Sequence, residues 1–514
     1  MAKAIMLQGT ASHVGKSVLT AALCRILRQD GWSVAPFKAQ NMSLNSGVTP
    51  DCGEIGRAQM LQAQAAGLTP SVDMNPVLLK PKGEMTAQVI IHGRAVQDAD
   101  WRRYRSEYRE RALRAVQESL VRLQMQHEIL VLEGAGSPAE VNLRAGDIAN
   151  MTAADLADAR VLLVGDIDRG GVMAALLGTL LLLAPEERER VDGLVVNRFR
   201  GDPTLFADGV EFLEQRAGLP VLGVVPYLPD LGLDEEDSVG LSPGGGRSGS
   251  ELDVAVIRLP RISNFNDFDP LAAEPGVGLR FVEDAGGLGI PDAVILPGTK
   301  NSVEDLLWLY ERGLAAGIAR LAGTGVPLLG VCGGYQMLGE DLVDAAAVES
   351  NRLRLPGLGL LPVRTEFAPE KLTLKVAAEP AAGAPDWLVG GGAVRGYEIH
   401  AGRTALLPGA LPLWRLTRRG GSACADADGA ISPDGQVLGT YLHGLFENTG
   451  FRRAWLNRLR RRRGLAPLPM QGAAADGREL ALDRLADHVR RHLDVAAVYR
   501  SLGLPGPKRE WEGG

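Results

Sequence analysis

Residues 327–339 read PLLGVCGGYQMLG, and this stretch determines how the second half of the chain is expected to fold. An apolar run leads into Cys332, glycines surround the cysteine, and a helix-compatible segment begins at Tyr335. The pattern predicts a strand, a tight turn with the cysteine at its tip, and a helix. Small neighbours permit a strained turn that lifts the side chain clear of the sheet, and the N-terminal end of a helix favours a thiolate. Because a merely structural buried cysteine needs no surrounding glycines, we expect Cys332 to be a nucleophile.

The composition is typical of a soluble protein with more than one domain. The chain has 514 residues, of which 46% are hydrophobic and 23% charged, and its formal net charge is −7. This length predicts two or three domains, and the mild acidic balance gives no indication of nucleic-acid binding. Four scattered cysteines without a CxxC pair argue against a disulfide framework and for a reducing, cytoplasmic location. The N-terminus has no signal-peptide pattern, and the longest apolar run, 172–185, is too short to span a membrane.

A glycine-rich loop near the N-terminus predicts a nucleotide site. Residues 9–17 read GTASHVGKS and lie between an apolar strand at 4–7 and a helix that starts at Val18. In this context the loop N–H groups bind phosphates, Lys16 reaches the β- and γ-phosphates of ATP, and the Ser17 hydroxyl binds Mg²⁺. The residues expected to bind ATP here are Gly9, Thr10, Gly15, Lys16 and Ser17. The loop is longer than the usual P-loop and resembles that of dethiobiotin synthetase and its relatives, which use ATP to activate carboxylates or carbamates.

Polar side chains follow strands of the same region. Lys38 and Asn41 lie in the run FKAQNMSLNS after a strand at 33–36, and Glu133 ends a fully apolar strand. Ligands of α/β sheets bind at the carboxyl ends of the strands. We therefore expect Lys38 and Asn41 to hold phosphate or a substrate carboxylate, although a solvated surface lysine is an equal alternative for Lys38. Glu133 occupies the place where P-loop folds keep a metal-associated acid, so we expect it to serve Mg²⁺ together with Ser17; a loop or cap acid is the alternative.

Repeated alternation of strands and helices predicts the fold of the first half. Six short apolar runs are separated by helical segments, which predicts an α/β fold with a doubly wound, mostly parallel sheet. These runs are 4–7, 33–36, 129–132, 161–164, 194–196 and 221–225. Asn197 follows one of them and is expected to read the adenine edge of ATP through paired hydrogen bonds. A composition break at 229–251, rich in glycine, serine and acidic residues, predicts a linker.

A second α/β domain follows the predicted linker. Strands are expected at 253–257 and 292–296, and a third strand leads to Cys332. The order of these strands places the turn after 292–296 near the cysteine. We therefore expect the backbone N–H groups of Gly298 and Gly333 to form an oxyanion hole.

A thiol nucleophile needs a general base, and two of the seven histidines are candidates. His443 ends the strand-like run 437–442 and precedes a glycine, so we expect it to be the base. His400, in GYEIHAG, is the alternative, although we expect it to position substrate or backbone instead.

Together these motifs resemble the glutamine amidotransferases of the cobyric and cobyrinic type. The runs GVCGGYQ at 330–336 and YLHG at 441–444 are similar to class I glutaminases, but a leucine stands where the class I pattern has a glutamate, two residues after the histidine. We expect Glu447 or Glu398 to orient His443 in its place, unless the site works as a dyad. The N-terminal motifs resemble the cobyric acid synthases more closely than the cobyrinic acid a,c-diamide synthases; they are GTASHVGKS, FKAQNMSLNS, EIGRAQ, LEGAGSPAE, DIDRGG and NRFRGD.

The resemblance covers nearly the whole chain and implies a reaction. It implies amidation of the four peripheral carboxylates b, d, e and g of adenosylcobyrinic acid a,c-diamide, in cobalamin biosynthesis, with ATP and Mg²⁺ as cofactors and L-glutamine as nitrogen donor. The implied partner is a small-molecule corrinoid substrate, with no nucleic acid and no membrane; assembly into a homo-oligomer stays open. Two alternatives also stay open, namely another amidoligase of the same architecture, such as a cobyrinic acid a,c-diamide synthase, or a non-catalytic P-loop switch ATPase with a degenerate glutaminase module.

The predicted organisation has four parts. They are a P-loop ATP-binding amidoligase domain at 1–228, similar in fold to dethiobiotin synthetase, the linker at 229–251, a class I glutamine amidotransferase α/β domain at 252–450, and a C-terminal helical extension at 451–514 that packs on the second domain. The extension is rich in arginine, which can indicate phosphate or nucleic-acid contact, but the acidic net charge favours an exposed helix face.

Overall fold

A computed structural model of the chain describes residues 2–82, 86–100, 108–229, 232–233, 249–470 and 477–509. The chain divides into two compact units. Unit 1 consists of Met1–Ser43, Glu54–Glu236 and Ala475–Gly514, and unit 2 of Leu44–Gly53 and Asp237–Ala474. The units are therefore not simply the two halves of the sequence, because each contains a piece that the chain order assigns to the other.

Unit 1 is built on a parallel six-stranded sheet with the order β12-β11-β10-β1-β9-β2. Its strands are β1 (Lys3–Gly9), β2 (Val34–Phe37), β9 (Ile129–Glu133), β10 (Arg160–Asp166), β11 (Val191–Phe199) and β12 (Val221–Pro226). These are the six strands predicted from the apolar runs, so the parallel sheet is confirmed. The central strands are buried on both faces, which explains why they read as continuous apolar runs rather than as alternating ones.

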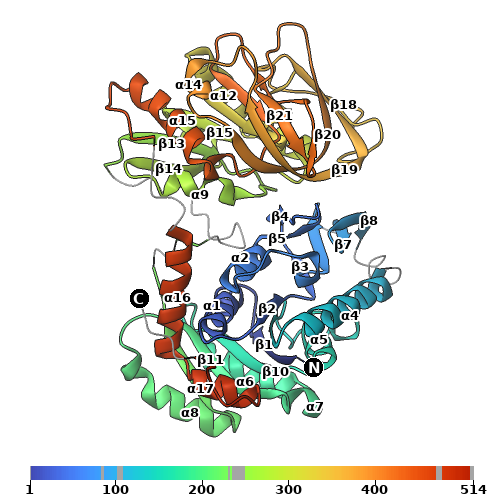
Figure 1. Cartoon of the computed structure of the whole chain (residues 1–514), viewed down its shortest axis with the longest axis vertical. Coiled ribbons are helices and arrows are strands. Elements are labelled where there is room, and N and C mark those ends of the chain that lie inside the picture. Colours follow the sequence, from blue (N-terminus) through green and yellow to red (C-terminus); the bar gives the residue numbers. More distant parts are fainter. Residues whose placement is uncertain are drawn as a thin grey trace. The chain divides into compact units, whose positions relative to one another are not determined.

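Helices from both ends of the chain cover one face of this sheet. They are α1 (Lys16–Gln29), α16 (Gly477–His492) and α17 (Val495–Ser501), which share one apolar core. Figure 1 shows α16 in red alongside α1 in blue. Arg25 of α1 binds Asp483 of α16 at 2.7 Å and Glu479 at 2.9 Å.

This packing corrects the prediction for the C-terminal extension. Residues 477–509 do not pack on the second domain, because they belong to unit 1. The first part of the extension, α15 (Thr449–Arg462) and the described residues that follow it up to 470, lies in unit 2 as predicted. The amphipathic pattern correctly indicated a helix with one buried face, but periodicity does not identify what that face packs against.

The remaining elements of unit 1 lie beside the main sheet. A second sheet, which was not predicted, has the order β3-β6-β7-β8 and consists of β3 (Gln40–Met42), β6 (Val77–Pro81), β7 (Thr86–Ile91) and β8 (Arg94–Asp100). The other elements are β5 (Glu54–Gly56), α2 (Arg57–Ala65), α4 (Arg109–Gln126), α5 (Met151–Leu156), α6 (Val172–Leu182), α7 (Pro185–Arg188) and α8 (Ala207–Ala217).

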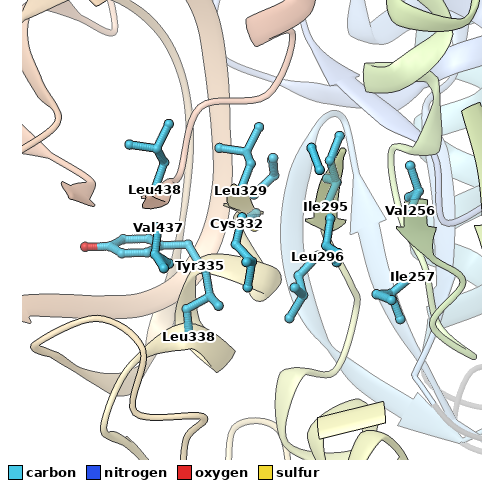
Figure 2. Close-up of a cluster of buried hydrophobic side chains, with 14 of the residues drawn as sticks. Val256, Ile257, Ile295, Leu296, Leu329, Cys332, Tyr335, Leu338, Val437 and Leu438 are labelled. Carbon is cyan, nitrogen blue, oxygen red and sulfur yellow. The ribbon is translucent and has the colours of Figure 1, made fainter. Parts of the chain in front are cut away.

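Unit 2 contains a second mostly parallel sheet, with the order β14-β13-β15-β16-β25-β24. Its strands are β13 (Leu252–Ile257), β14 (Val277–Val282), β15 (Ala293–Leu296), β16 (Leu328–Val331), β24 (Ala430–Ile431) and β25 (Val437–Thr440). Val256, Ile295, Leu329 and Leu438 form a row of register partners across β13, β15, β16 and β25 (Figure 2). This buried row holds β16 in the middle of the sheet, and β16 ends at the cysteine turn.

The rest of unit 2 includes a sheet that was not predicted. It has the order β18-β17-β19-β21-β22, with β20 paired to β19 and β23 to β21. Its strands are β17 (Asp341–Val343), β18 (Arg354–Pro356), β19 (Val363–Pro380), β20 (Val394–Leu406), β21 (Trp414–Arg419), β22 (Ser422–Ala423) and β23 (Ala427–Asp428). The helices before α15 are α9 (Asp269–Ala272), α10 (Ala285–Leu288), α11 (Ser302–Glu311), α12 (Leu314–Gly323), α13 (Gly333–Leu338) and α14 (Asp386–Val389).

Two further segments bear on the predicted organisation. Leu44–Gly53, which includes β4 (Ser46–Val48), belongs to unit 2 although it lies inside the predicted first domain. Most of the predicted linker, 230–231 and 234–248, lies outside the described residues. None of the helices in the described part of the chain is both long enough and apolar enough to cross a membrane.

Candidate functional sites

The cysteine turn has the geometry that its sequence predicts. Cys332 lies between β16 and α13 with φ 52° and ψ −109°, a backbone conformation that costs energy for a residue other than glycine. A Cβ atom added to Gly334 would lie 2.0 Å from the carbonyl oxygen of Leu296, so this position accepts only glycine. The close approach of α13 to β15 therefore explains why glycine follows the cysteine turn.

The structure brings the two predicted catalytic side chains together. The imidazole of His443, which follows β25, lies close enough to the Cys332 side chain for Cys332 to raise the pKa of the ring, and the Cys332 thiol donates to the carbonyl oxygen of Ile399 at 3.6 Å. On its other side, His443 Nδ1 lies 2.6 Å from Asp267 Oδ2. The second oxygen of the same carboxylate accepts a hydrogen bond of 2.9 Å from the backbone N–H of Gly444. Cys332, His443 and Asp267 thus form a chain of neighbouring groups, which are a nucleophile, an imidazole and a carboxylate.

The electrostatics of this chain favour a proton on His443. Burial by itself lowers the pKa of His443, but the charge and hydrogen bond of Asp267, together with Cys332, raise it to about 10. An imidazole with a raised pKa is a better acceptor for the thiol proton. The same group, once protonated, can donate to a leaving nitrogen.

Asp267 was missed by the sequence reasoning, which expected Glu447 or Glu398 to orient His443. Glu398 instead binds His400 Nε2 at 3.2 Å and also pairs with Arg419. Asp267 lies 176 residues before His443. A signal was present nonetheless, because Asp267 lies in the segment that follows β13, and polar residues after parallel strands had served to find the other candidates.

His400, the alternative base, makes its hydrogen bonds to Gly402 and Glu398. Its Nδ1 contacts the carbonyl oxygen of Gly402 at 2.7 Å, and its ring stacks on Tyr441 with centroids 3.7 Å apart. Burial, the largest influence, lowers the pKa of His400. Because both ring nitrogens of His400 are hydrogen-bonded, the side chain fits a structural role better than the role of base for the thiol.

The two glycines of the predicted oxyanion hole lie near the cysteine and the histidine. A Cβ added to Gly298 would lie 2.9 Å from His443 Cε1, and one added to Gly333 would lie 3.2 Å from the backbone nitrogen of Thr299. The N–H of the next residue, Gly334, donates to the carbonyl oxygen of Pro297 at 3.0 Å. The turn after β15 and the start of α13 therefore meet beside Cys332.

The P-loop in unit 1 also forms as predicted. Gly15 has φ 94° and ends the loop as the N-cap of α1. Lys16 Nζ donates to the carbonyl oxygens of Ala11 at 2.9 Å and Gly136 at 3.1 Å, so it points back across the loop. Asn197 Nδ2 donates to the carbonyl oxygen of Val14 at 2.8 Å. This contact ties β11 to the P-loop, and the recognition of adenine by Asn197 stays a prediction.

Glu133 is the centre of a buried polar cluster at the end of β9. Its Oε1 accepts hydrogen bonds of 2.8 Å from both Ser17 Oγ and Lys38 Nζ. Its Oε2 accepts one of 2.6 Å from Gln62 Nε2. The structure therefore brings Ser17, Lys38 and Glu133 together as the sequence predicted, and adds Gln62, which α2 contributes.

The donor set around Glu133 fits Mg²⁺ rather than a tightly chelated metal. Within the described ranges, no group of three or more His, Cys, Asp or Glu side chains could hold a metal ion. A hydroxyl and a carboxylate 2.8 Å apart suit an ion that takes its other ligands from phosphate and water. Ser17 and Glu133 would hold the ion, and it would neutralise phosphate charge.

Asn41, three residues after Lys38 in the sequence, lies in a cluster of amide side chains. Asn41 Nδ2 donates to Gln59 Oε1 at 2.9 Å, and both side chains are buried. Among the described residues, Gln59 Nε2 and Gln62 Oε1 are buried without a hydrogen-bond partner. Buried amide groups without partners are costly, so these atoms are suited to bind a polar ligand.

Comparison with known proteins matches two ranges of the chain to described families. Residues 5–239 match the CobQ/CobB/MinD/ParA nucleotide binding domain, and residues 253–451 match the CobB/CobQ-like glutamine amidotransferase domain. A cobyric acid synthase of Pelotomaculum thermopropionicum is 56% identical over 99% of this chain and 98% of its own. The cobyric acid synthase of Moorella thermoacetica is 51% identical over 99% and 98% of the two chains, and that of Salmonella typhimurium 49% over 97% and 98%.

Proposed function

Because this chain belongs to the cobyric acid synthase family, we propose that its two units carry out the two halves of one amidation reaction. The chain is a glutamine-dependent amidoligase of cobalamin biosynthesis that acts on a corrinoid. In the proposal, unit 2 releases ammonia from glutamine and unit 1 activates a corrinoid carboxylate with Mg-ATP. The observation that carries the proposal is the hydrogen bond between His443 and Asp267 in unit 2, with Cys332 next to the same imidazole.

The glutaminase half-reaction follows from the positions of these three side chains. His443 takes the proton of Cys332 as the sulfur attacks the amide carbon of glutamine, and the carbonyl electron pair moves to the oxygen. The N–H groups of Gly298 and Gly333 would stabilise that oxygen. When the carbon–nitrogen bond breaks, His443 donates its proton to the nitrogen, and ammonia leaves. Water then hydrolyses the thioester, with His443 accepting its proton, and glutamate is released.

The activation half-reaction is assigned to the cluster around Glu133. Lys16 and the P-loop N–H groups would bind the β- and γ-phosphates, and Lys38 and Asn41 would hold the transferred phosphoryl group or the substrate carboxylate. A carboxylate oxygen attacks the γ-phosphorus, ADP leaves, and an acyl phosphate forms. Ammonia then attacks the acyl carbon and phosphate leaves, which yields the amide. We assign the acceptor as adenosylcobyrinic acid a,c-diamide, with amidation at the b, d, e and g carboxylates.

The experiment compares wild type with Cys332→Ala on the corrinoid diamide and Mg-ATP, with nitrogen from either glutamine or ammonium. The product is read by mass spectrometry. Wild type should add four amides from either source, whereas Cys332→Ala should add them from ammonium alone. Cys424→Ala, which removes a half-buried free cysteine of the same unit, is the matched control and should behave as wild type.

Two results would contradict the proposal. If Cys332→Ala still used glutamine, Cys332 would not be the nucleophile. If neither nitrogen source gave the four amides while ATP was hydrolysed, the assigned acceptor would be wrong, and the alternative of a different amidoligase or of a switch ATPase would replace it.

A further inference from the structure

The imidazole of His443 lies against the aromatic ring of Tyr397, a residue outside the chain of Cys332, His443 and Asp267. The two ring centroids are 5.3 Å apart and the interplanar angle is 19°, so the rings are stacked. The His443 side chain is buried, with 1% of the residue exposed, whereas Tyr397 is half-buried. Tyr397 therefore covers one face of the imidazole that takes the thiol proton in the proposed reaction.

The backbone holds the two stacked residues together. Tyr397 belongs to β20, His443 follows β25, and the two residues form an antiparallel bridge. The N–H of Tyr397 donates to the carbonyl oxygen of His443 at 3.2 Å, and the N–H of His443 donates to that of Tyr397 at 2.8 Å. A Cβ added to Gly396 would lie 2.3 Å from the carbonyl oxygen of His443, so only glycine lets β20 approach this closely. The pairing of the two backbones thus places the Tyr397 ring on the imidazole.

The other neighbours of the imidazole contact its edge atoms. Asp267 Oδ2 lies 2.6 Å from Nδ1, and Cys332 lies close enough to raise the pKa of the ring. A Cβ added to Gly298 would lie 2.9 Å from Cε1. Of these neighbours, Tyr397 is the one that stacks on the plane of the ring. The hydrogen bond to Asp267 fixes one atom of the imidazole, and the stack restricts rotation of its plane.

An aromatic neighbour also bears on the charge of the base. His443 becomes an imidazolium when it takes the proton of Cys332 in the proposed reaction. The face of an aromatic ring carries partial negative charge, and a cation within about 6 Å of the ring centroid is attracted to it. Because His443 is buried, water screens this attraction only weakly. The stacked ring of Tyr397 therefore favours the protonated imidazole over the neutral one.

The same strand supplies a second stacked pair, which does not involve the base. His400 of β20 stacks on Tyr441 with centroids 3.7 Å apart. Both ring nitrogens of His400 are already bonded, to Gly402 and to Glu398. Of the two stacks that the run GYEIHAG contributes, the one made by Tyr397 is therefore the one that can influence transfer of the thiol proton.

We propose that Tyr397 is a positioning residue of the glutaminase site, which fixes the plane of the His443 imidazole by stacking and stabilises its protonated form. The proposal rests on the proposed function of unit 2. The ring of Tyr397 makes the contact with His443, whereas its hydroxyl lies 3.4 Å from the carbonyl oxygen of Ser46. The aromatic ring, and not the hydroxyl, is therefore the group that this role requires.

Tyr397→Leu tests the proposal, because it removes the aromatic face and keeps an apolar side chain. Tyr397→Met is a second variant without the ring, and its flexible side chain adapts to the space that the ring leaves. Tyr397→Phe keeps the ring, loses only the hydroxyl and is the rescue variant. Tyr310→Leu is the matched control, since it makes the same change at an exposed position of α11 in the same unit.

The measurements are kcat and KM for glutamine hydrolysis as a function of pH, and the rate of amidation from ammonium. Tyr397→Leu and Tyr397→Met should lower kcat by about tenfold, with KM for glutamine within about twofold, because the orientation of the base matters in the transition state and not in substrate binding. The alkaline limb of kcat should move to lower pH by about half a unit to one unit, since the imidazolium loses an attractive neighbour. Ammonium-dependent amidation should be unchanged, and Tyr397→Phe and Tyr310→Leu should behave as wild type.

Other outcomes would overturn the inference. An alkaline limb that stayed in place would remove the influence of Tyr397 on the imidazolium, and an unchanged kcat in both variants without the ring would remove its role altogether. A rise in KM with unchanged kcat would make Tyr397 part of the glutamine site, and an equal loss in Tyr397→Phe would assign the effect to the hydroxyl. An equal loss with glutamine and ammonium would make Tyr397 a structural support. Failure of the proposed function is recognised separately, because it would show in wild type and Cys332→Ala.

Discussion

The two units hold their reactive groups in opposite ways. In unit 2, Cys332, His443 and Asp267 lie next to one another in the order in which a proton must move, and the bond between His443 and Asp267 is already made. In unit 1, Lys16 is bound to backbone carbonyl groups of its own surroundings, and Glu133 is occupied by three side-chain donors. Unit 2 is therefore preorganised for its chemistry, whereas in unit 1 a ligand has to replace internal contacts before the site can act.

The largest expected effect tests the phosphate site of unit 1. Lys16→Ala should lower amidation by about 10²–10³-fold with either glutamine or ammonium, because the cation that would neutralise the charge of the phosphates is lost. The measurement is the initial rate of amide formation from each nitrogen source. Lys508→Ala, an exposed lysine of unit 1, is the control. A loss confined to glutamine would contradict the division of labour between the units.

A smaller effect tests the preorganisation of unit 2. Asp267→Asn should lower glutamine hydrolysis by about 10²-fold, because the imidazole loses the charge that favours its protonation, and ammonium-dependent amidation should be unchanged. Asp267 raises the pKa of His443, so its removal lowers that pKa from about 10. The imidazolium that donates to the leaving nitrogen is then lost at a lower pH.

The pH dependence of glutamine hydrolysis tests the role of Asp267 most directly. The alkaline limb of kcat for glutamine hydrolysis should move to lower pH in Asp267→Asn. Glu447→Gln, which changes the carboxylate expected from the sequence, is the control and should leave the limb in place. A limb that moved in Glu447→Gln but not in Asp267→Asn would restore the original expectation.

The smallest effect on activity concerns the C-terminal helix of unit 1. Leu485 is buried in the core that α16 shares with α1, so Leu485→Ala should reduce the stability of unit 1 by about 2–5 kcal/mol. Glutamine hydrolysis by folded protein at 25 °C should not change. Thermal unfolding followed by calorimetry checks the first expectation, and Leu480→Ala, at an exposed position of the same helix, should leave the melting temperature unchanged.

The sequence predicted best those features that depend on local pattern. Glycines around Cys332 and Lys16 indicated both turns, since only tight backbone approaches require glycine at such positions. Polar residues after apolar strands indicated Glu133 and Lys38, because parallel strands bring their carboxyl ends to one edge. These inferences needed no knowledge of which distant segments meet.

What the sequence did not reveal depends on long-range placement. Asp267 reaches His443 only because β13 and β25 belong to the same sheet, and no local pattern states the order of strands. Leu44–Gly53 and α16 were each assigned to the wrong unit for a similar reason. Chain order and periodicity indicate that a face will be covered, but its partner is determined by the whole fold.

The return of α16 to unit 1 has a consequence for how the protein is made. A ribosome completes β1, α1 and the rest of the nucleotide-binding sheet first, and then synthesises all of unit 2 before α16 and α17 appear. Until then the apolar surface that Leu482, Leu485 and Val489 later cover is exposed. Nascent chains that stall late, or that are cut within the last part of the sequence, would therefore display this face to chaperones and proteases even when unit 2 has already folded.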